Sequence, residues 1–241
     1  MTKTFFKYVI PSMLAFALSG IYAIVDGFFV GNSVGDQGLA TINLVYPLVA
    51  LIQAAGTGIG MAGAIHFAIA EGGNRMNERN RYFWITCGLL VLVSVVLTLV
   101  YLPLGGTLLR LLGAQGALES YGREYITVIT MGILFQVLGV GLVPVIRNMG
   151  KSIQAMAAMI AGFLTNILLD YVFVWVLPYG LAGAAAATVL GQAVTMIWCL
   201  AVLYPLRKML KAQWDKGWEY QTTRILKLTP SPLGLTFVPN V

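Results

Sequence analysis

Charged residues are scarce in this sequence. They make up 10% of the 241 residues, whereas hydrophobic residues make up 59%, and the mean hydropathy is +0.83. A water-soluble domain usually has about 25% charged and about 45–50% apolar residues, so the composition excludes a soluble enzyme or binding domain. We therefore expect a membrane protein.

Cysteine and histidine are also rare. Cys87 and Cys199 fall inside long apolar runs, where we expect neither a disulfide nor a four-ligand metal site. His66, the single histidine, lies near the end of the second apolar run. We interpret it as an interfacial or packed residue, with a proton relay as the alternative.

Alternating apolar and polar segments, which the strands of a membrane barrel show, are missing. A helix that crosses ~30 Å of hydrocarbon needs about 20 apolar residues, and the long runs match that length. They predict an all-α polytopic membrane protein: a six-helix bundle followed by the start of a seventh helix near Ile225. The six predicted spans are 8–30, 39–70, 82–102, 125–146, 152–177 and 181–204.

Basic residues lie in alternate connections between these spans. Of the fifteen, only Arg110 and Arg123 fall in the other connections, so the positive-inside rule places the N-terminus in the cytoplasm. Because the charge follows topology, we expect no nucleic-acid partner. A cleavable signal peptide is the alternative for the first run, but that run continues to Val30, far beyond a signal's apolar core.

Two carboxylates lie well inside the predicted spans, where a charged side chain costs a few kcal/mol. Both predicted helices run outward, with Asp26 shortly before a turn expected at Gly31 and Asp170 shortly before Pro178. The helical rise puts both acids roughly 8–12 Å below the outer edge of the membrane. We therefore expect them to share one depth.

Neutral oxygen donors are predicted at the same level. Asn166 lies one helical turn from Asp170, and Thr188 faces the same level across the hairpin turn at 177–180. The run of small residues before Thr188 allows close helix packing and can expose backbone carbonyls, among them that of Ala184. These oxygens suit Na⁺ or H⁺, with at least one acid expected to hold a proton; the alternative is protonated acids acting only as interhelical hydrogen-bond partners.

Prolines and other polar residues inside the spans complete the candidates. Pro11, Pro47 and Pro144 each remove a backbone hydrogen bond and favour bending helices. Several polar side chains are candidates for lining a substrate cavity, although ordinary interhelical hydrogen bonds explain them equally well. These are Tyr22, Asn43, Tyr46, Gln53 and Gln136.

The stretch 205–224 has alternating charge with Trp214 and Trp218, typical of an interfacial amphipathic segment or of a solvated basic loop. The segment after it, from Lys227, resembles the segment from Lys7, as if a second repeat begins there. We therefore divide the chain into a bundle (1–204), a cytoplasmic linker (205–224) and the start of a second lobe (225–241).

Three segments carry a family resemblance: Pro11…Asp26-Gly-Phe-Phe-Val-Gly31-Asn-Ser-Val-Gly35…Leu39-Ala40, Asn166-Ile-Leu-Leu-Asp170 and Gly183-Ala-Ala-Ala-Ala-Thr188. Together they resemble the N-terminal lobe of the multidrug and toxic compound extrusion (MATE) transporters of the bacterial multidrug-export type. The resemblance covers about residues 5–241.

The resemblance implies a bacterial inner-membrane antiporter that exports organic, often cationic, compounds in exchange for Na⁺ or H⁺, with no other cofactor. It also implies that Asp26, Asn166, Asp170 and Thr188 form the cation site. Tyr125 matches a tyrosine near that site, and Pro11 matches the position where the first helix bends.

Family members have twelve spans in two lobes. The length of this sequence leaves three interpretations: a piece of a longer protein, a half that pairs with a second copy of itself, or a half that pairs with another chain. A flippase for lipids or lipid-linked oligosaccharides, from the same superfamily, is the alternative function. An intramembrane aspartyl protease would also use two acids, but the residues around Asp26 and Asp170 do not resemble its motifs, so we expect no enzyme.

Overall fold

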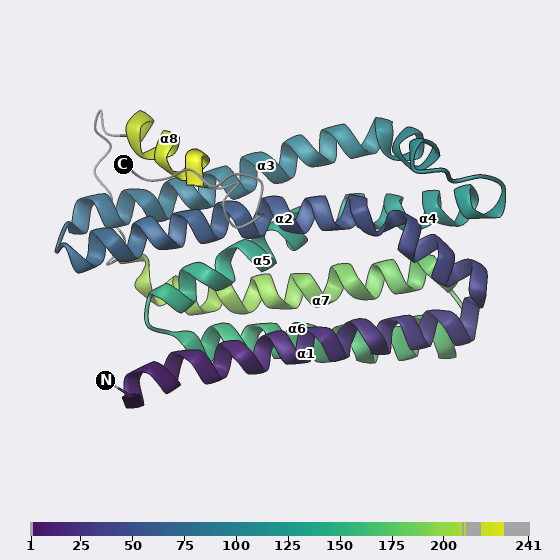
Figure 1. Cartoon of the computed structure of the whole chain (residues 1–241), viewed down its shortest axis with the longest axis horizontal. Helices are drawn as coiled ribbons and strands as arrows, with labels where there is room; N and C mark the ends of the chain where they lie inside the picture. Colours follow the sequence, from purple (N-terminus) through teal and green to yellow (C-terminus); the bar gives the residue numbers. More distant parts are fainter. Residues whose placement is uncertain (1, 209, 211–217, 229–241) are drawn as a thin grey trace.

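The computed structural model describes residues 2–208, 210 and 218–228. For most residues before Ile24 it describes the backbone alone, so the predictions for the side chains of Pro11 and Tyr22 lie outside the described residues. The described residues are almost entirely helical, which confirms the all-α class, and the long helices lie side by side in one bundle (Figure 1). The α-helices are α1 (Thr2–Val34), α2 (Asp36–Gly72), α3 (Met76–Leu111), α4 (Ala117–Met131), α5 (Ile133–Asn148), α6 (Ser152–Asp170), α7 (Gly180–Leu203) and α8 (Trp218–Leu228).

The predicted spans fall on these helices. Four helical stretches of the described chain are long and apolar enough to cross a membrane: α2, α3, α7 with its continuation, and α6 with the π-helix (Tyr171–Val176) that follows it. The helices α4 and α5 are a bent pair that is long and apolar enough for a fifth crossing when the pair is taken as one span. With α1, whose backbone is one helix, each predicted span has a helix.

The fourth span is broken at a residue that the sequence prediction missed. Helices α4 and α5 meet at Gly132 with a bend of 59°, whereas the prediction had one run over 125–146 that bends at Pro144. A side chain on Gly132 would collide with Val189 of α7, so the absence of a side chain allows α7 to pack against the corner. Pro144 lies within α5.

Two predicted boundaries were also wrong. Helix α3 continues through Pro103 to Leu111 because the apolar pattern persists beyond the proline and Leu109 is fully buried. The first turn lies at Gly35 and not at Gly31, which is still helical. Gly35 has φ +76°, a left-handed conformation that glycine adopts at little cost.

Helix α8 packs on α2 and α3 beside the turn that joins them (Figure 1). It buries Ile225 completely and Gln221 almost completely, while its other face is exposed. Part of the stretch expected to be amphipathic is therefore an amphipathic helix, whereas residues 211–217, with Trp214, lie outside the described residues. The helix continues past residue 224, and the division of the chain into lobe and linker stays a prediction.

Candidate functional site

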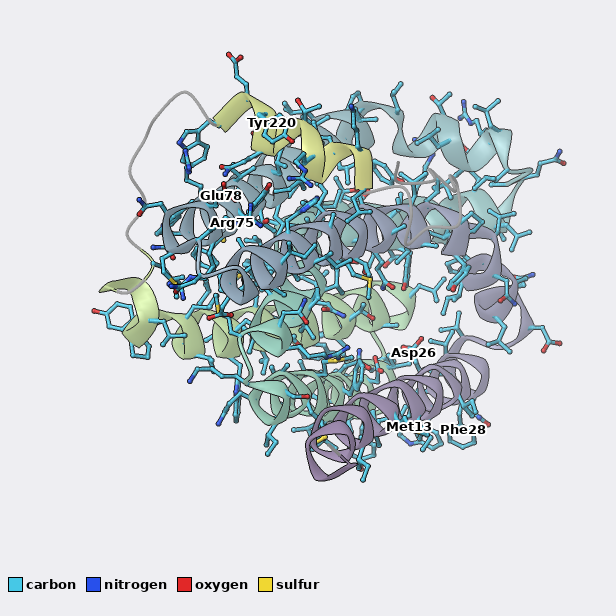
Figure 2. All side chains as sticks on the ribbon, turned by 60° about the vertical axis from the view of Figure 1, so that its left-hand side comes forward. Met13, Asp26, Phe28, Arg75, Glu78 and Tyr220 are labelled. Carbon is cyan, nitrogen blue, oxygen red and sulfur yellow. The ribbon has the colours of Figure 1, made fainter. Side chains whose placement is uncertain are left out.

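The two acids predicted to share one depth meet between α1 and α6. The carboxyl groups of Asp26 and Asp170 are in hydrogen-bond contact, and the Asp170 side chain is completely buried. Figure 2 shows Asp26 pointing from α1 into the bundle, whereas Met13 and Phe28 of the same helix point away. A hydrogen bond between two carboxyl groups requires a proton on at least one of them.

Asn166 connects Asp170 to α7. With its amide oriented to satisfy both neighbours, its nitrogen donates to Asp170 Oδ2 at 3.1 Å and its oxygen accepts from the Thr188 backbone N–H at 3.1 Å. In this orientation the amide oxygen of Asn166 also lies 3.5 Å from Thr188 Oγ1. The amide therefore fixes α6 and α7 in register beside the acids.

The small residues of α7 make this close approach possible. Asn166 and Thr188 are both buried, and Ala184, one turn before Thr188, is 1% exposed. A Cβ on Gly183 would lie 2.8 Å from the backbone oxygen of Phe173 in the π-helix. Glycine at that position lets the start of α7 pack directly on the π-helix.

Two oxygen atoms at the centre of the cluster are still available. Oδ1 of Asp26 and Oδ1 of Asp170 are both buried, and neither has a hydrogen-bond partner among the described residues. A buried oxygen of this kind costs free energy unless a proton, a water molecule or a cation satisfies it. The described residues contain no group of three or more His, Cys, Asp or Glu side chains that fits a transition metal.

A π-helix follows Asp170 directly and was not predicted. In this segment, Tyr171–Val176, the Ser33 hydroxyl of α1 donates to the Val174 backbone carbonyl at 2.7 Å. π-Helical turns are rare and occur frequently at functional sites, because they redirect backbone groups. The run of β-branched and aromatic residues after Asp170 was the available signal, since such residues are weak helix formers.

Aromatic side chains pack between α1 and the π-helix that follows Asp170. The Phe29 ring packs edge-on against Tyr171 at 6.4 Å and against Trp175 at 6.1 Å, measured between ring centroids. Phe28 stacks on the same Trp175 ring at 6.5 Å. The rings therefore add an apolar contact between α1 and the π-helix.

The remaining predicted residues lie on other helices. Tyr125 is buried on α4, and Gln136 on α5 is fully buried with neither amide atom hydrogen-bonded within the described part of the chain. On α2, Asn43 is exposed and Gln53 is half-buried. His66 is packed, as expected: its ring is buried and stacks on Tyr82 with 5.0 Å between centroids.

Comparison with known proteins gives consistent matches. The sequence profile of the MatE family matches residues 11–172. The multidrug export protein MepA of Staphylococcus saprophyticus is 26% identical over 208 residues, which are 86% of this chain and 45% of that protein.

Solved structures match over nearly all of this chain and about half of their own length. A crystal structure of MATE in complex with MaD3S superposes with a TM-score of 0.88 at 26% identity, over 97% of this chain and 53% of that one. The outward-facing conformation of a multidrug resistance MATE family transporter of the MOP superfamily gives a TM-score of 0.87 at 26% identity, over 97% and 52%. The chain thus spans about half the length of the relatives it matches.

Proposed function

The chain belongs to the MatE family, and from this membership and the geometry of the acid pair we propose that it is one six-helix lobe of an ion-driven multidrug efflux transporter. The observation that carries the proposal is the contact between the carboxyl groups of Asp26 and Asp170. Two acids in contact repel each other when both are ionised, and one Oδ1 atom of each is buried, so the pair needs a bound cation or a proton. The pair is therefore a cation site that also holds two helices together.

The geometry supports a proton as the ion in the described conformation. The hydrogen bond between the two acids accounts for one proton, and Asn166 stabilises Asp170 from the α7 side. Na⁺ would be bound by oxygen atoms of both acids, with Asn166, Thr188 and the Ala184 carbonyl as candidate neutral ligands. The attraction between α1 and α6 changes when the proton is exchanged for Na⁺. It also changes when the proton is lost to the cytoplasm.

This change links the ion to movement of the lobe. Loss of the cation leaves two like charges at the α1–α6 contact, which favours the separation of α1 from α6 and from the π-helix bonded to Ser33. Movement of α1 against the rest of the bundle changes which side of the membrane reaches the site. An inward ion gradient thereby supplies the free energy for outward transport.

The acids also suggest the charge of the substrate. Organic cations can approach the carboxyl groups of Asp26 and Asp170, whereas a flippase for anionic lipid-linked substrates would need basic groups at this site. We place Asn43 and Gln53 of α2 at the surface facing a second lobe, whereas Gln136 lies fully buried within this lobe. The second lobe, or a second copy of this chain, supplies the opposing half of the cavity in a bacterial inner membrane.

Efflux of a fluorescent organic cation from everted membrane vesicles tests this proposal in the complete two-lobe transporter. We expect Asp26→Asn and Asp170→Asn each to abolish efflux driven by a proton or sodium gradient. Asp36→Asn is the matched control, because Asp36 is an exposed acid at the start of α2. Full efflux by both site variants would refute the proposal.

A further inference from the structure

A groove lies between α6 and α7, about 18 Å along α6 from the acid site by the helical rise between Asn166 and Gln154. Its volume is about 490 Å³. It is lined by Gln154, Val194, Ile197, Trp198, Ala201 and Val202. Five of these six side chains have largely apolar surfaces, so the groove suits a hydrocarbon chain.

The polar residues of the groove are those found at the edge of a membrane. The Trp198 indole Nε1 donates to Gln154 Oε1 at 3.3 Å, which joins the two helices across the groove. Tryptophan concentrates at the level of the lipid headgroups, with its ring in hydrocarbon and its N–H near water. The groove therefore begins at the headgroup level and continues toward the membrane interior.

Positive charge lies at the same end of α6. Lys151 directly precedes the helix and lies three residues before Gln154. No described carboxylate pairs with Lys151, and no side chain caps the first backbone N–H groups of α6. Free N–H groups at a helix N-terminus and a lysine together attract a phosphate.

We propose that the α6–α7 groove binds an anionic phospholipid of the inner leaflet. One acyl chain lies along Val194, Ile197 and Val202, and the phosphate lies beside Lys151 and the first turn of α6. The leaflet follows from the proposed orientation, which places Lys151 on the cytoplasmic side. Basic pockets between membrane helices on that side bind anionic headgroups in the same manner.

The site can be tested on the purified chain by measuring lipid binding directly, without transport. Delipidated protein in detergent is titrated with dioleoyl phosphatidylglycerol, with dioleoyl phosphatidylcholine, and with glycerol phosphate as the free headgroup, and binding is followed by native mass spectrometry. We expect phosphatidylglycerol to bind about fivefold more tightly than phosphatidylcholine, as one lysine near the surface predicts. Glycerol phosphate should bind far more weakly than either lipid.

Two substitutions separate the headgroup from the acyl chain. Lys151→Gln should remove the preference for phosphatidylglycerol, whereas Lys227→Gln, at an exposed lysine of α8, should leave it unchanged. Ala201→Phe fills the groove from an exposed position and should weaken binding of both lipids, whereas Leu190→Phe, also exposed on α7, should not.

Equal binding of the two lipids to the unmodified chain would overturn the proposal, as would a preference that survives Lys151→Gln. If glycerol phosphate bound as tightly as phosphatidylglycerol, the site would be one for a free phosphate compound, and the proposal of a lipid site would be wrong. These outcomes are independent of efflux, so failure of this site is distinguishable from failure of the proposed transport function.

Discussion

Ser33, at the end of α1, donates its hydroxyl hydrogen to the backbone carbonyl of Val174, in the π-helix that follows Asp170, at 2.7 Å. The bond joins α1 to the segment that continues α6, beyond the acid pair in the direction of both helices. The described structure thus connects α1 to α6 through two polar contacts, one between side chains and one to a redirected backbone group. A single conformational step that separates α1 from α6 has to break both.

Removing the Ser33 hydroxyl should weaken this connection. We expect Ser33→Ala to lower the free energy of unfolding by about 1 kcal/mol, because one hydrogen bond is lost and the Val174 carbonyl is left without its partner. Thermal unfolding in detergent measures the change. Ser120→Ala, at an exposed serine of α4, is the control, and equal losses in the two variants would contradict the assignment.

Asn166 and Thr188 should contribute unequally to the cation site. Asn166→Ala removes a donor to Asp170 and the acceptor of the Thr188 N–H. We therefore expect the free energy of unfolding to fall by about 1–3 kcal/mol and ion-driven efflux to be lost. Thr188→Val keeps the backbone N–H and removes one neutral oxygen, so its effect on cation affinity should be modest. Cation titrations of both variants that give the reverse order would contradict this ranking.

The contact between α7 and the π-helix depends on Gly183. We expect Gly183→Ala to destabilise the protein by about 1–3 kcal/mol, because the added Cβ would lie 2.8 Å from the Phe173 carbonyl oxygen. Gly88→Ala is the control: a Cβ at Gly88 meets no atom within 4 Å, and alanine is the better helix former. Unfolding temperatures that fall equally in both variants would show that the close approach is unimportant.

Helix α8 should detach from α2 and α3 when its buried anchor is truncated. Ile225 is completely buried, so Ile225→Ala should cost about 2–5 kcal/mol at this contact. Hydrogen–deuterium exchange should then accelerate in residues 218–228. Leu226→Ala, at the neighbouring exposed position, should leave the exchange of this segment unchanged, and identical exchange in the two variants would count against the docked arrangement.

The sequence predicts the polar cluster, because a buried carboxylate in a membrane costs free energy. The structure differs from the prediction where helix geometry depends on close packing between distant parts of the chain. The contact between Asp26 and Asp170 follows from their depth and helix direction, and Asn166 follows from helical spacing. The corner at Gly132 packs against Val189, which is distant in the sequence, and the packing of α7 on the π-helix depends on Gly183. Such close contacts leave no periodic pattern in the chain.

The same limit explains the wrong boundaries. A proline usually ends a helix, but the buried Leu109 extends α3 beyond Pro103. Gly31 and Gly35 are both possible turn residues in the sequence. Of the two, only Gly35 has the left-handed φ at which this turn is made. Which of two glycines turns the chain is decided by the packing of the helices on both sides.

The most direct test of the account is the pH dependence of unfolding in the unmodified chain and in Asp26→Asn and Asp170→Asn. If the two acids share a proton in the folded state that the unfolded chain releases, stability should fall as pH rises above the ordinary carboxyl pKa of about 4, until the folded chain releases the proton as well. Each single substitution should reduce that fall, because one titrating acid is removed and an uncharged amide then faces the remaining acid, which stays buried. A fall of the same size in all three proteins would contradict the shared cation on which the transport proposal depends.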